Sequence, residues 1–324
     1  MTSVGMRINP RKKKISYAKW GYIFLIPFFA IFIVFQLVPL VQTFYYSFFE
    51  DYRDGLTQIG PNFIGFDNYI SIFQNDFGKY LGNTLIIWIL GFVPQIVISL
   101  LLAIWFTDMR LKLKCTGIFK TIVYMPNLVM AAALGMLFMT LTCQIGPIAK
   151  LFVEWGWIPE NSDIGNFVWG SRGVIAFMNF LMWFGNTTIL LMSGVMGIDE
   201  SVYEAARIDG AGSWHVFWDI TMPLLMPIFT FVLVTSMIGG IQLFDCAQIF
   251  TKGNGGPDLT SMTLMMLLYR TISNAHNVGL GGAISVILFI ISAILSILVF
   301  FLTGAKDQIK ALGSNSRKKK VSVK

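Results

Sequence analysis

Six long apolar stretches constrain this chain more than any other feature. An α-helix rises 1.5 Å per residue, so about 20 apolar residues cross the hydrocarbon core of a bilayer. The stretches lie at roughly 20–48, 81–106, 119–141, 173–197, 223–247 and 280–303. Almost no charge interrupts them, Asp245 near the end of the fifth being the clear exception. Prolines such as Pro126 are expected to kink the packed helices. The pattern predicts an all-α membrane protein with six transmembrane helices over residues 20–303.

The charges outside these stretches predict which side of the membrane each segment faces. Lysine and arginine concentrate on the cytoplasmic flanks of membrane proteins. Basic residues gather in the tail 1–19, in the tail 304–324, and in the segment 107–117 with Arg110, Lys112 and Lys114. Acidic residues dominate 49–80 instead. We therefore expect both basic tails to be cytoplasmic, which an even number of crossings allows. The inside loops are then 107–117 and 198–222, and the outside loops are 49–80, 142–172 and 248–279.

Composition and the scattered polar residues exclude several classes of function. Only 13% of the 324 residues are charged, against about one quarter in a soluble domain. The net charge of +7 sits mostly in the tails, so no nucleic-acid partner is expected. The candidate metal ligands lie far apart, so no metal site is predicted: Cys115, Cys143, Cys246, His215 and His276. The chain has no GxxxxGK[ST] sequence to cradle nucleotide phosphates and no catalytic triad. We therefore assign no catalytic residue and predict that the chain is not an enzyme.

The inside segment from Asp199 to Pro223, DESVYEAARIDGAGSWHVFWDITMP, is too polar to cross the membrane. It is predicted to form two short helices joined by a glycine turn. Ser201 and Glu204 have the spacing of a capping box, and Gly210 stands where a helix end favours a left-handed residue. Ser213 is expected to cap the second helix. On local physics alone, an amphipathic hairpin lying on lipid headgroups is an equally good reading.

One spacing within this segment is more specific. Glu204-Ala205-Ala206, then Gly210, then Ile220 and Met222-Pro223, resembles the EAA loop of permease subunits of binding-protein-dependent ABC importers. The usual pattern has leucine before the proline, so Met222 is an apolar departure of similar volume. The resemblance implies a MetI-like, or type I, importer permease fold with a cytoplasmic coupling loop, 199–222. Its helix, about 200–209, would insert into a groove on a separate ATPase. The coupling residues it implies are Tyr203, Glu204, Ala205, Ala206, Asp209, Gly210, Ala211 and Gly212.

Further segments are similar to the carbohydrate branch of that family, the maltose and multiple-sugar type. These segments are FIGFDNYISIF at 63–73, NTLIIWILGF from Asn83, and GIQLFDCAQIFTKGNGGP at 240–257. The resemblance covers roughly residues 20–303 and implies a bacterial inner-membrane importer of sugars, oligosaccharides or uronides that works by alternating access. It also implies three kinds of protein partner: a second homologous permease, two ATPase subunits and an extracytoplasmic solute-binding protein. ATP and Mg would bind to the ATPase subunits, and this chain would bind no cofactor.

The substrate path is expected in the fourth and fifth spans, because the resemblance places contacts near 182–186 and 236–243. Sugars are held by aromatic stacking and by neutral polar groups. In the fourth span, Asn179, Trp183 and Asn186 recur on one helical face. In the fifth span, the candidates are Ser236, Gly240, Gln242 and Asp245. Small and polar residues also serve as packing between membrane helices, so that reading stays open for all seven.

Two other classes compete with the importer reading. A secondary transporter driven by an ion gradient usually places ionisable residues at mid-membrane and often contains repeated halves. Apart from Asp245 these spans are uncharged, and the two halves show no repeat. A structural or assembly protein of the membrane is the third class. Neighbouring reading frames for a second permease and a binding protein would separate the three.

Overall fold

The structure is a computed structural model that describes residues 18–107 and 116–303. The two basic tails and the positive residues of the 107–117 segment lie outside the described residues. Six helical segments within the described ranges are long and apolar enough to cross a membrane. They are Lys19–Tyr46, Phe77–Thr107, Ala131–Glu154, Val168–Met196, Ser213–Phe250 and Val278–Leu302. The predicted six-span, mostly helical architecture is confirmed, although the bounds of the third and fifth spans differ from those predicted.

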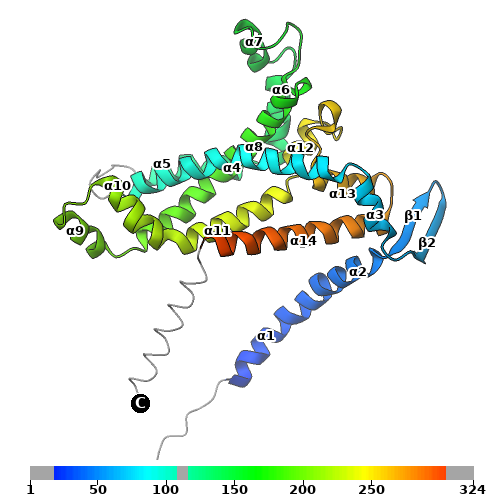
Figure 1. Ribbon diagram of the computed structural model, residues 1–324, viewed down its shortest axis with the longest axis horizontal. Helices are drawn as coiled ribbons and strands as arrows, with labels where there is room; N and C mark the ends of the chain where they lie inside the picture. The colour runs from blue at the N-terminus through cyan, green and yellow to red at the C-terminus, as the bar shows by residue number, and fades with distance from the viewer. Residues whose placement is uncertain (1–17, 108–115, 304–324) are drawn as a thin grey trace, which may run out of the picture.

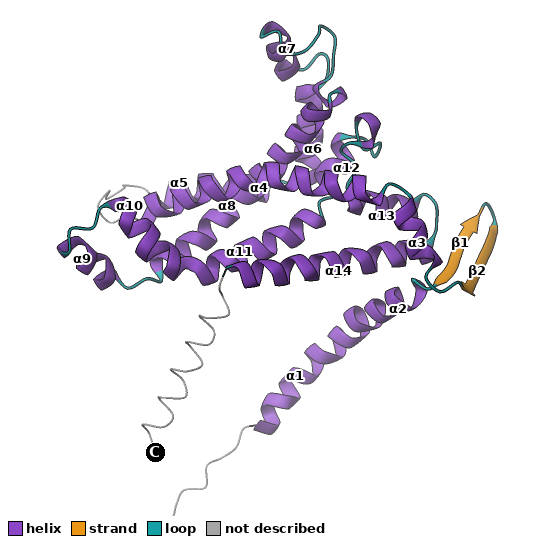
Figure 2. Ribbon diagram, viewed as in Figure 1, coloured by secondary structure: helices purple, strands orange, loops and turns teal. Residues whose placement is uncertain are grey.

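The first span stands apart from the rest of the molecule (Figures 1 and 2). It consists of α1 (Ala18–Phe32), a π-helical turn η1 (Ile33–Leu37) and α2 (Val38–Tyr46). None of its most apolar window is buried in this chain. The first span packs on the bundle at its C-terminal end, in α2, where the rings of Phe44 and Phe289 meet edge to face with centroids 6.0 Å apart. Nearly all of the apolar surface of the first span is therefore not covered by the rest of the described chain.

Spans two and four form the centre of the bundle. They are α4 (Phe77–Thr107) and α8 (Val168–Met196), which make the most extensive helix–helix contact. The Gln95 amide donates to the Thr187 hydroxyl at 2.7 Å, and the Ser99 hydroxyl donates to the Phe184 carbonyl at 2.8 Å. A Cβ at Gly91 would lie 2.8 Å from the Ala176 carbonyl oxygen. Small residues and interhelical hydrogen bonds thus hold these two spans together, as is usual in membrane bundles.

The third span is not the single helix predicted at 119–141. The chain forms α5 (Thr116–Tyr124), the 3-10 turn η2 (Met125–Leu128), α6 (Ala131–Thr142) and then α7 (Pro147–Glu154). The backbone is extended at Val129 and Met130, so the helix is interrupted just after Pro126. Proline cannot donate a helix hydrogen bond, and its ring disfavours the preceding turn. The interrupted segment is held against α8, because the Asn127 amide donates to the Met182 carbonyl at 2.7 Å.

The segment between spans one and two contains a β-hairpin that the sequence analysis did not predict. Strands β1 (Phe49–Asp54) and β2 (Thr57–Phe63) pair antiparallel, with an irregularity between Glu50 and Tyr52, and α3 (Asp67–Gln74) follows. Two residues of the FIGFDNYISIF segment anchor this region. The Asn68 amide donates to the carbonyls of Ser47 and Phe49, at 3.0 and 2.9 Å, and the Tyr69 hydroxyl donates to that of Ser47 at 2.7 Å.

The remaining elements are short helices at the two ends of the bundle, together with the fifth and sixth spans. The segment joining spans four and five contains α9 (Glu200–Ile208) and α10 (Ser213–His215), followed by a π-helical stretch η4 (Val216–Thr221) and α11 (Met222–Ile241). At the opposite end lie η3 (Ile164–Asn166), α12 (Asp245–Phe250), η5 (Pro257–Leu259) and α13 (Leu264–Ser273). The last span is α14 (Val278–Leu302). In Figure 1, α9 and the hairpin β1–β2 lie at opposite extremes of the molecule.

Candidate functional site

The helix α9 projects from one end of the molecule (Figure 1) and begins differently from the prediction. Its N-cap is Asp199, whose carboxylate accepts from the Ser201 N–H at 2.9 Å and from the Ser201 hydroxyl at 2.8 Å. The predicted capping box of Ser201 and Glu204 is therefore wrong, because Ser201 already lies inside the helix and Asp199 takes the cap position. The Ser201 N–H, and then its hydroxyl, lower the pKa of the Asp199 carboxyl below its ordinary value of 3.8.

The C-terminal end of α9 follows the prediction. Gly210 has a φ of +76°, the left-handed conformation that glycine adopts without strain. The N–H groups of Gly210 and Ala211 donate to the carbonyls of Arg207 and Ala206, at 3.1 and 2.9 Å. This closes the last turn of the helix rigidly.

The predicted cap at Ser213 is wrong. Gly212, with extended backbone, occupies the N-cap of α10, and Ser213 is the first helical residue. From that position a hydroxyl does not reach the free N–H groups of the next turn. Helical structure then continues through η4 into α11, so Pro223 connects the loop to the fifth span.

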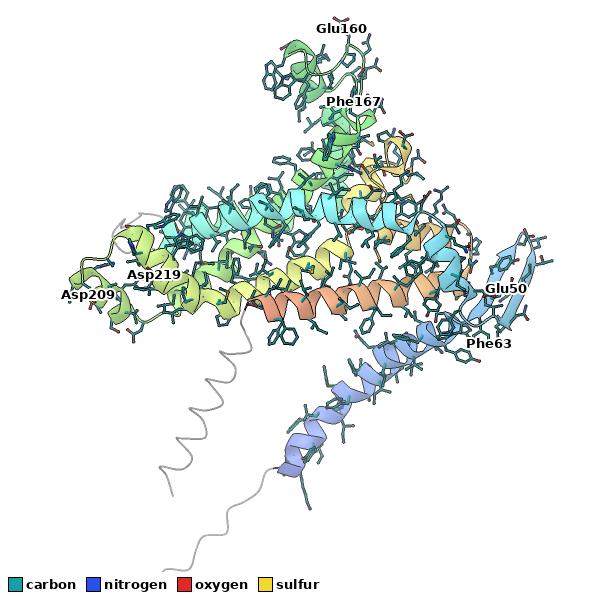
Figure 3. The ribbon with its side chains drawn as sticks, in the orientation of Figure 1. Glu50, Phe63, Glu160, Phe167, Asp209 and Asp219 are labelled. Atoms are coloured by element: carbon teal, nitrogen blue, oxygen red, sulfur yellow. The ribbon has the colours of Figure 1, made fainter. Side chains whose placement is uncertain are left out.

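The exposed surface of α9 and of the segment that follows it combines charged and small residues with large apolar side chains. Glu204, Ala205, Asp209 and Gly210 are exposed, and Asp209 lies at the tip of this projection (Figure 3). Exposed apolar side chains surround them: Ile208 is 86% exposed, Trp214 71% and Trp218 48%. Such a patch with a polar rim is typical of a protein-binding surface. Most of the predicted coupling residues, from Tyr203 to Gly212, thus lie together on one projection.

Two of the predicted coupling residues face their own chain. Ala206 is only 7% exposed, so the small surface available to another backbone is Ala205. The Tyr203 hydroxyl lies 3.3 Å from that of Thr221, at the end of η4. Tyr203 therefore ties α9 to the helical stretch that leads into the fifth span, and a displacement of α9 would be passed to α11.

The predicted substrate-path residues of α8 are available for contacts. Trp183 is 47% exposed, and Asn179 and Asn186 are partly exposed. No hydrogen bond joins either asparagine side chain to another residue in the described part of the chain. The face that the spacing predicted therefore carries an indole and two amides without protein partners.

The candidates of the fifth span divide into different environments. Ser236 accepts a hydrogen bond from the Trp88 indole at 3.2 Å, and a Cβ at Gly240 would lie 2.0 Å from Trp88 Cδ1. These are contacts of helix packing. Asp245 begins α12, after the short break that ends α11, and so lies within the fifth apolar segment, as predicted, but not in α11 itself. Gln242 lines a cavity of about 440 Å³ between α11, α13 and α14.

That cavity contains residues that the sequence analysis missed. Its wall on α14 includes three serines, Ser285, Ser292 and Ser296. Their spacings of seven and four place them on one helical face, which is a signal that the apolar sixth stretch could have supplied. The hydroxyls of Ser285 and Ser292 donate to the carbonyls of Gly281 and Leu288, one helical turn earlier. The Ser296 oxygen is buried and has no hydrogen-bond partner among the residues that the structure describes.

A second missed feature lies at the end of the bundle opposite α9, around the buried guanidinium of Arg172 in α8. It donates to the Asn83 side-chain oxygen at 2.7 Å and to the Thr260 carbonyl at 2.9 Å. The Asn83 amide in turn donates to the carbonyls of Leu259 and Met262, at 2.8 and 3.2 Å. These bonds fasten the segment after the glycine-rich turn to α4 and α8.

Within the described ranges, no group of three or more histidine, cysteine, aspartate or glutamate side chains is placed to hold a metal ion. The arrangement combines an apolar bundle, a rigid projecting helix at one end and a hydrogen-bonded loop at the other.

Comparison with known proteins identifies membrane transport permeases as relatives of this chain. Residues 95–308 match the family described as binding-protein-dependent transport system inner membrane component. The chain is 29% identical over 283 residues to the lactose transport system permease protein of Rhizobium radiobacter, covering 87% of this chain and 93% of that protein. It is 30% identical over 289 residues to the multiple sugar-binding transport system permease protein of Streptococcus mutans, covering 88% and 96%.

A solved structure shares the fold. A chain of a bacterial ABC transporter involved in the import of the acidic polysaccharide alginate aligns with a TM-score of 0.70 at 19% identity, covering 89% of this chain and 96% of that one. The likeness therefore extends over most of both chains.

Proposed function

Because this chain belongs to the family of binding-protein-dependent transport system inner membrane components, we propose that it is one half of the translocation pathway of an ATP-driven sugar importer. It is a multi-pass membrane protein of that transport family. The observation that carries the proposal is the family match over residues 95–308, which includes the fourth and fifth spans and the loop between them.

The proposed substrate is a sugar or oligosaccharide. The two relatives named above are permeases for lactose and for multiple sugars, and the chain that shares the fold belongs to an importer of an acidic polysaccharide. Neutral and uronide oligomers are therefore both candidates. Trp183 with Asn179 and Asn186 supplies the aromatic and amide groups that sugar binding requires, and Gln242 adds an amide from the fifth span.

ATP hydrolysis is assigned to partner subunits. The proposed docking surface is α9, with Ala205, Asp209 and Gly210 exposed and the apolar side chains of Ile208 and Trp214 beside them. ATP and Mg would bind to two ATPase subunits, and this chain would contribute only the coupling surface. A capped helix with a closed C-terminal turn transmits displacement, whereas a flexible loop would absorb it.

A second, homologous permease would complete the pathway. The first span supports this, since α1 and α2 contain no residue buried within the described chain. An extracytoplasmic binding protein would deliver the sugar to the end that carries β1–β2 and the glycine-rich turn 253–257. Both termini would then lie in the cytoplasm, and the complex would reside in the bacterial inner membrane.

The test is uptake of a panel of labelled saccharides by vesicles that contain the reconstituted complex. ATP inside and the binding protein outside should both be required. Uptake driven by an ion gradient without ATP would support the alternative, a secondary transporter. Full transport with one ATPase and no second permease would refute the heteromeric arrangement.

The coupling surface is tested separately with Ala205→Arg, which places a long charged side chain on the exposed face of α9. Binding-protein-stimulated ATP hydrolysis should fall at least tenfold while membrane insertion is retained. Ala205→Ser, which keeps a small side chain at the same exposed position, is the matched control. Normal coupling in both variants would remove α9 from the mechanism.

A further inference from the structure

A cavity of about 440 Å³ lies between α9 and the helix ends of the bundle, on the side of α9 that faces its own chain. It gathers residues from α4, α5, α8, α9 and the start of the fifth span. Its walls are Ile104, Phe106, Thr107, Lys120, Val195, Met196, Ile198, Glu200, Tyr203, Arg207, Ser213, Val216, Phe217 and Thr221. Of these residues only Tyr203 has a predicted role, in coupling, and that role does not require a cavity at this place.

The cavity combines an apolar wall with cationic groups. Most of its surface is apolar, from residues such as Ile104, Val195 and Phe217. Lys120 and Arg207 contribute two positive charges, against the one negative charge of Glu200. Neither cation forms an ion pair with another residue in the ranges that the structure describes. The hydroxyls of Thr107 and Ser213 also line the cavity.

The position of the cavity selects the kind of ligand. Thr107 and Met196 are the last residues of α4 and α8, and Lys120 lies in the first turns of α5. Since spans end at the boundary between hydrocarbon and water, the cavity lies at the depth of the lipid headgroups. Basic pockets between membrane helices on the cytoplasmic side bind anionic headgroups, while the adjoining apolar wall suits an acyl chain.

We propose that this cavity binds an anionic phospholipid, with its phosphate between Lys120 and Arg207 and an acyl chain against Ile104, Val195 and Phe217. The cytoplasmic assignment of this end rests on the proposed function. An ATPase subunit is the less suitable occupant, because it would dock on the opposite, exposed face of α9. A bound lipid would brace α9 against the ends of the second, third and fourth spans, so coupling should depend on lipid composition.

The experiment uses the complete complex with its partner permease and ATPases, in nanodiscs of phosphatidylcholine with or without phosphatidylglycerol. Native mass spectrometry counts retained phosphatidylglycerol, and binding-protein-stimulated ATP hydrolysis is measured in parallel. Lys120→Gln should weaken retention about fivefold, the change that follows from about 1 kcal/mol per lysine at a membrane surface. Lys150→Gln, exposed on α7 at the other end, should leave retention unchanged.

A second variant avoids dependence on charge alone. Val195→Trp should fill the apolar wall and reduce retention while leaving both cations in place. Equal retention by the wild type, Lys120→Gln and Val195→Trp would overturn the proposal. So would displacement of the lipid by millimolar glycerol 3-phosphate, which would identify the site as one for soluble phosphates.

The outcome is separable from that of the proposed function. A complex that imports sugar but retains no phosphatidylglycerol would refute only the lipid site. A complex that retains the lipid and imports no saccharide would refute only the proposed substrate.

Discussion

Removal of the Arg172 guanidinium should release the outer loop from the bundle. Arg172→Met keeps the length of the side chain and deletes its donors, leaving the Asn83 side-chain oxygen and the Thr260 carbonyl without the bonds of 2.7 and 2.9 Å. A buried polar group left unpaired costs about 1–3 kcal/mol, so the two groups together cost about 2–6 kcal/mol. Relief of the desolvation of a buried cation offsets part of this. We expect a net loss of about 2 kcal/mol.

That loss has a measurable consequence for the segment 257–263. A change of about 2 kcal/mol raises the population of the open loop about 30-fold. Met262 is 1% exposed, so a cysteine at this position, in a background without the native cysteines, is modified only when the loop opens. Its rate of reaction with a membrane-impermeant maleimide should rise about 30-fold in Arg172→Met.

Controls separate this network from a general loss of structure. Arg270→Met removes an exposed arginine from α13, nearby on the same end, and should leave the modification rate unchanged. Arg172→Lys keeps the charge with fewer aligned donors and should be intermediate. The double variant Arg172→Met with Asn83→Leu should lose less stability of the closed loop than the sum of the two single variants. Both residues belong to the same hydrogen-bond network, which either change already breaks. A rate for Arg172→Met within twofold of the wild type would refute the reasoning.

Three further predictions follow from the site. Gly240→Ala should displace the Trp88 indole and break its hydrogen bond to Ser236. The stability of the solubilised complex, measured by thermal denaturation, should fall by about 1–3 kcal/mol. An unchanged stability would mean that Gly240 faces open space and belongs to the substrate path. Asp199→Ala should reduce stimulated ATP hydrolysis while Asp199→Asn preserves it. Because the pKa of Asp199 is lowered below 3.8, the contribution of its charged form is present at neutral pH and lost only as the pH falls through that lowered value, so a wild-type coupling loss centred near pH 6 would need another group. Cysteine pairs across the outer ends of this subunit and the second permease should crosslink readily at rest and poorly with trapped ATP, and equal crosslinking in both states would argue against outward opening on ATP binding.

The six spans and the loop between the fourth and fifth were predictable because their causes are local. Bilayer thickness dictates the length of each apolar run, and a left-handed turn at Gly210 follows from the few residues around it. Local rules failed where two good candidates compete within a few residues. Asp199 and Ser201 both favour a cap position, and only the observed backbone shows that Asp199 occupies it.

The tertiary structure alone decided which polar residues pack and which face a cavity. Trp88 and Ser236 are 148 positions apart, and Asn83 reaches carbonyls 176 and 179 positions away. The sequence marked Ser236 and Gly240 as polar or small but carried no sign of the indole that fills the space beside them. Contacts of this kind depend on how spans cross and how deeply each lies against its neighbour. In a membrane these are set by close packing and by the need to pair every buried polar group, rather than by any property of one segment.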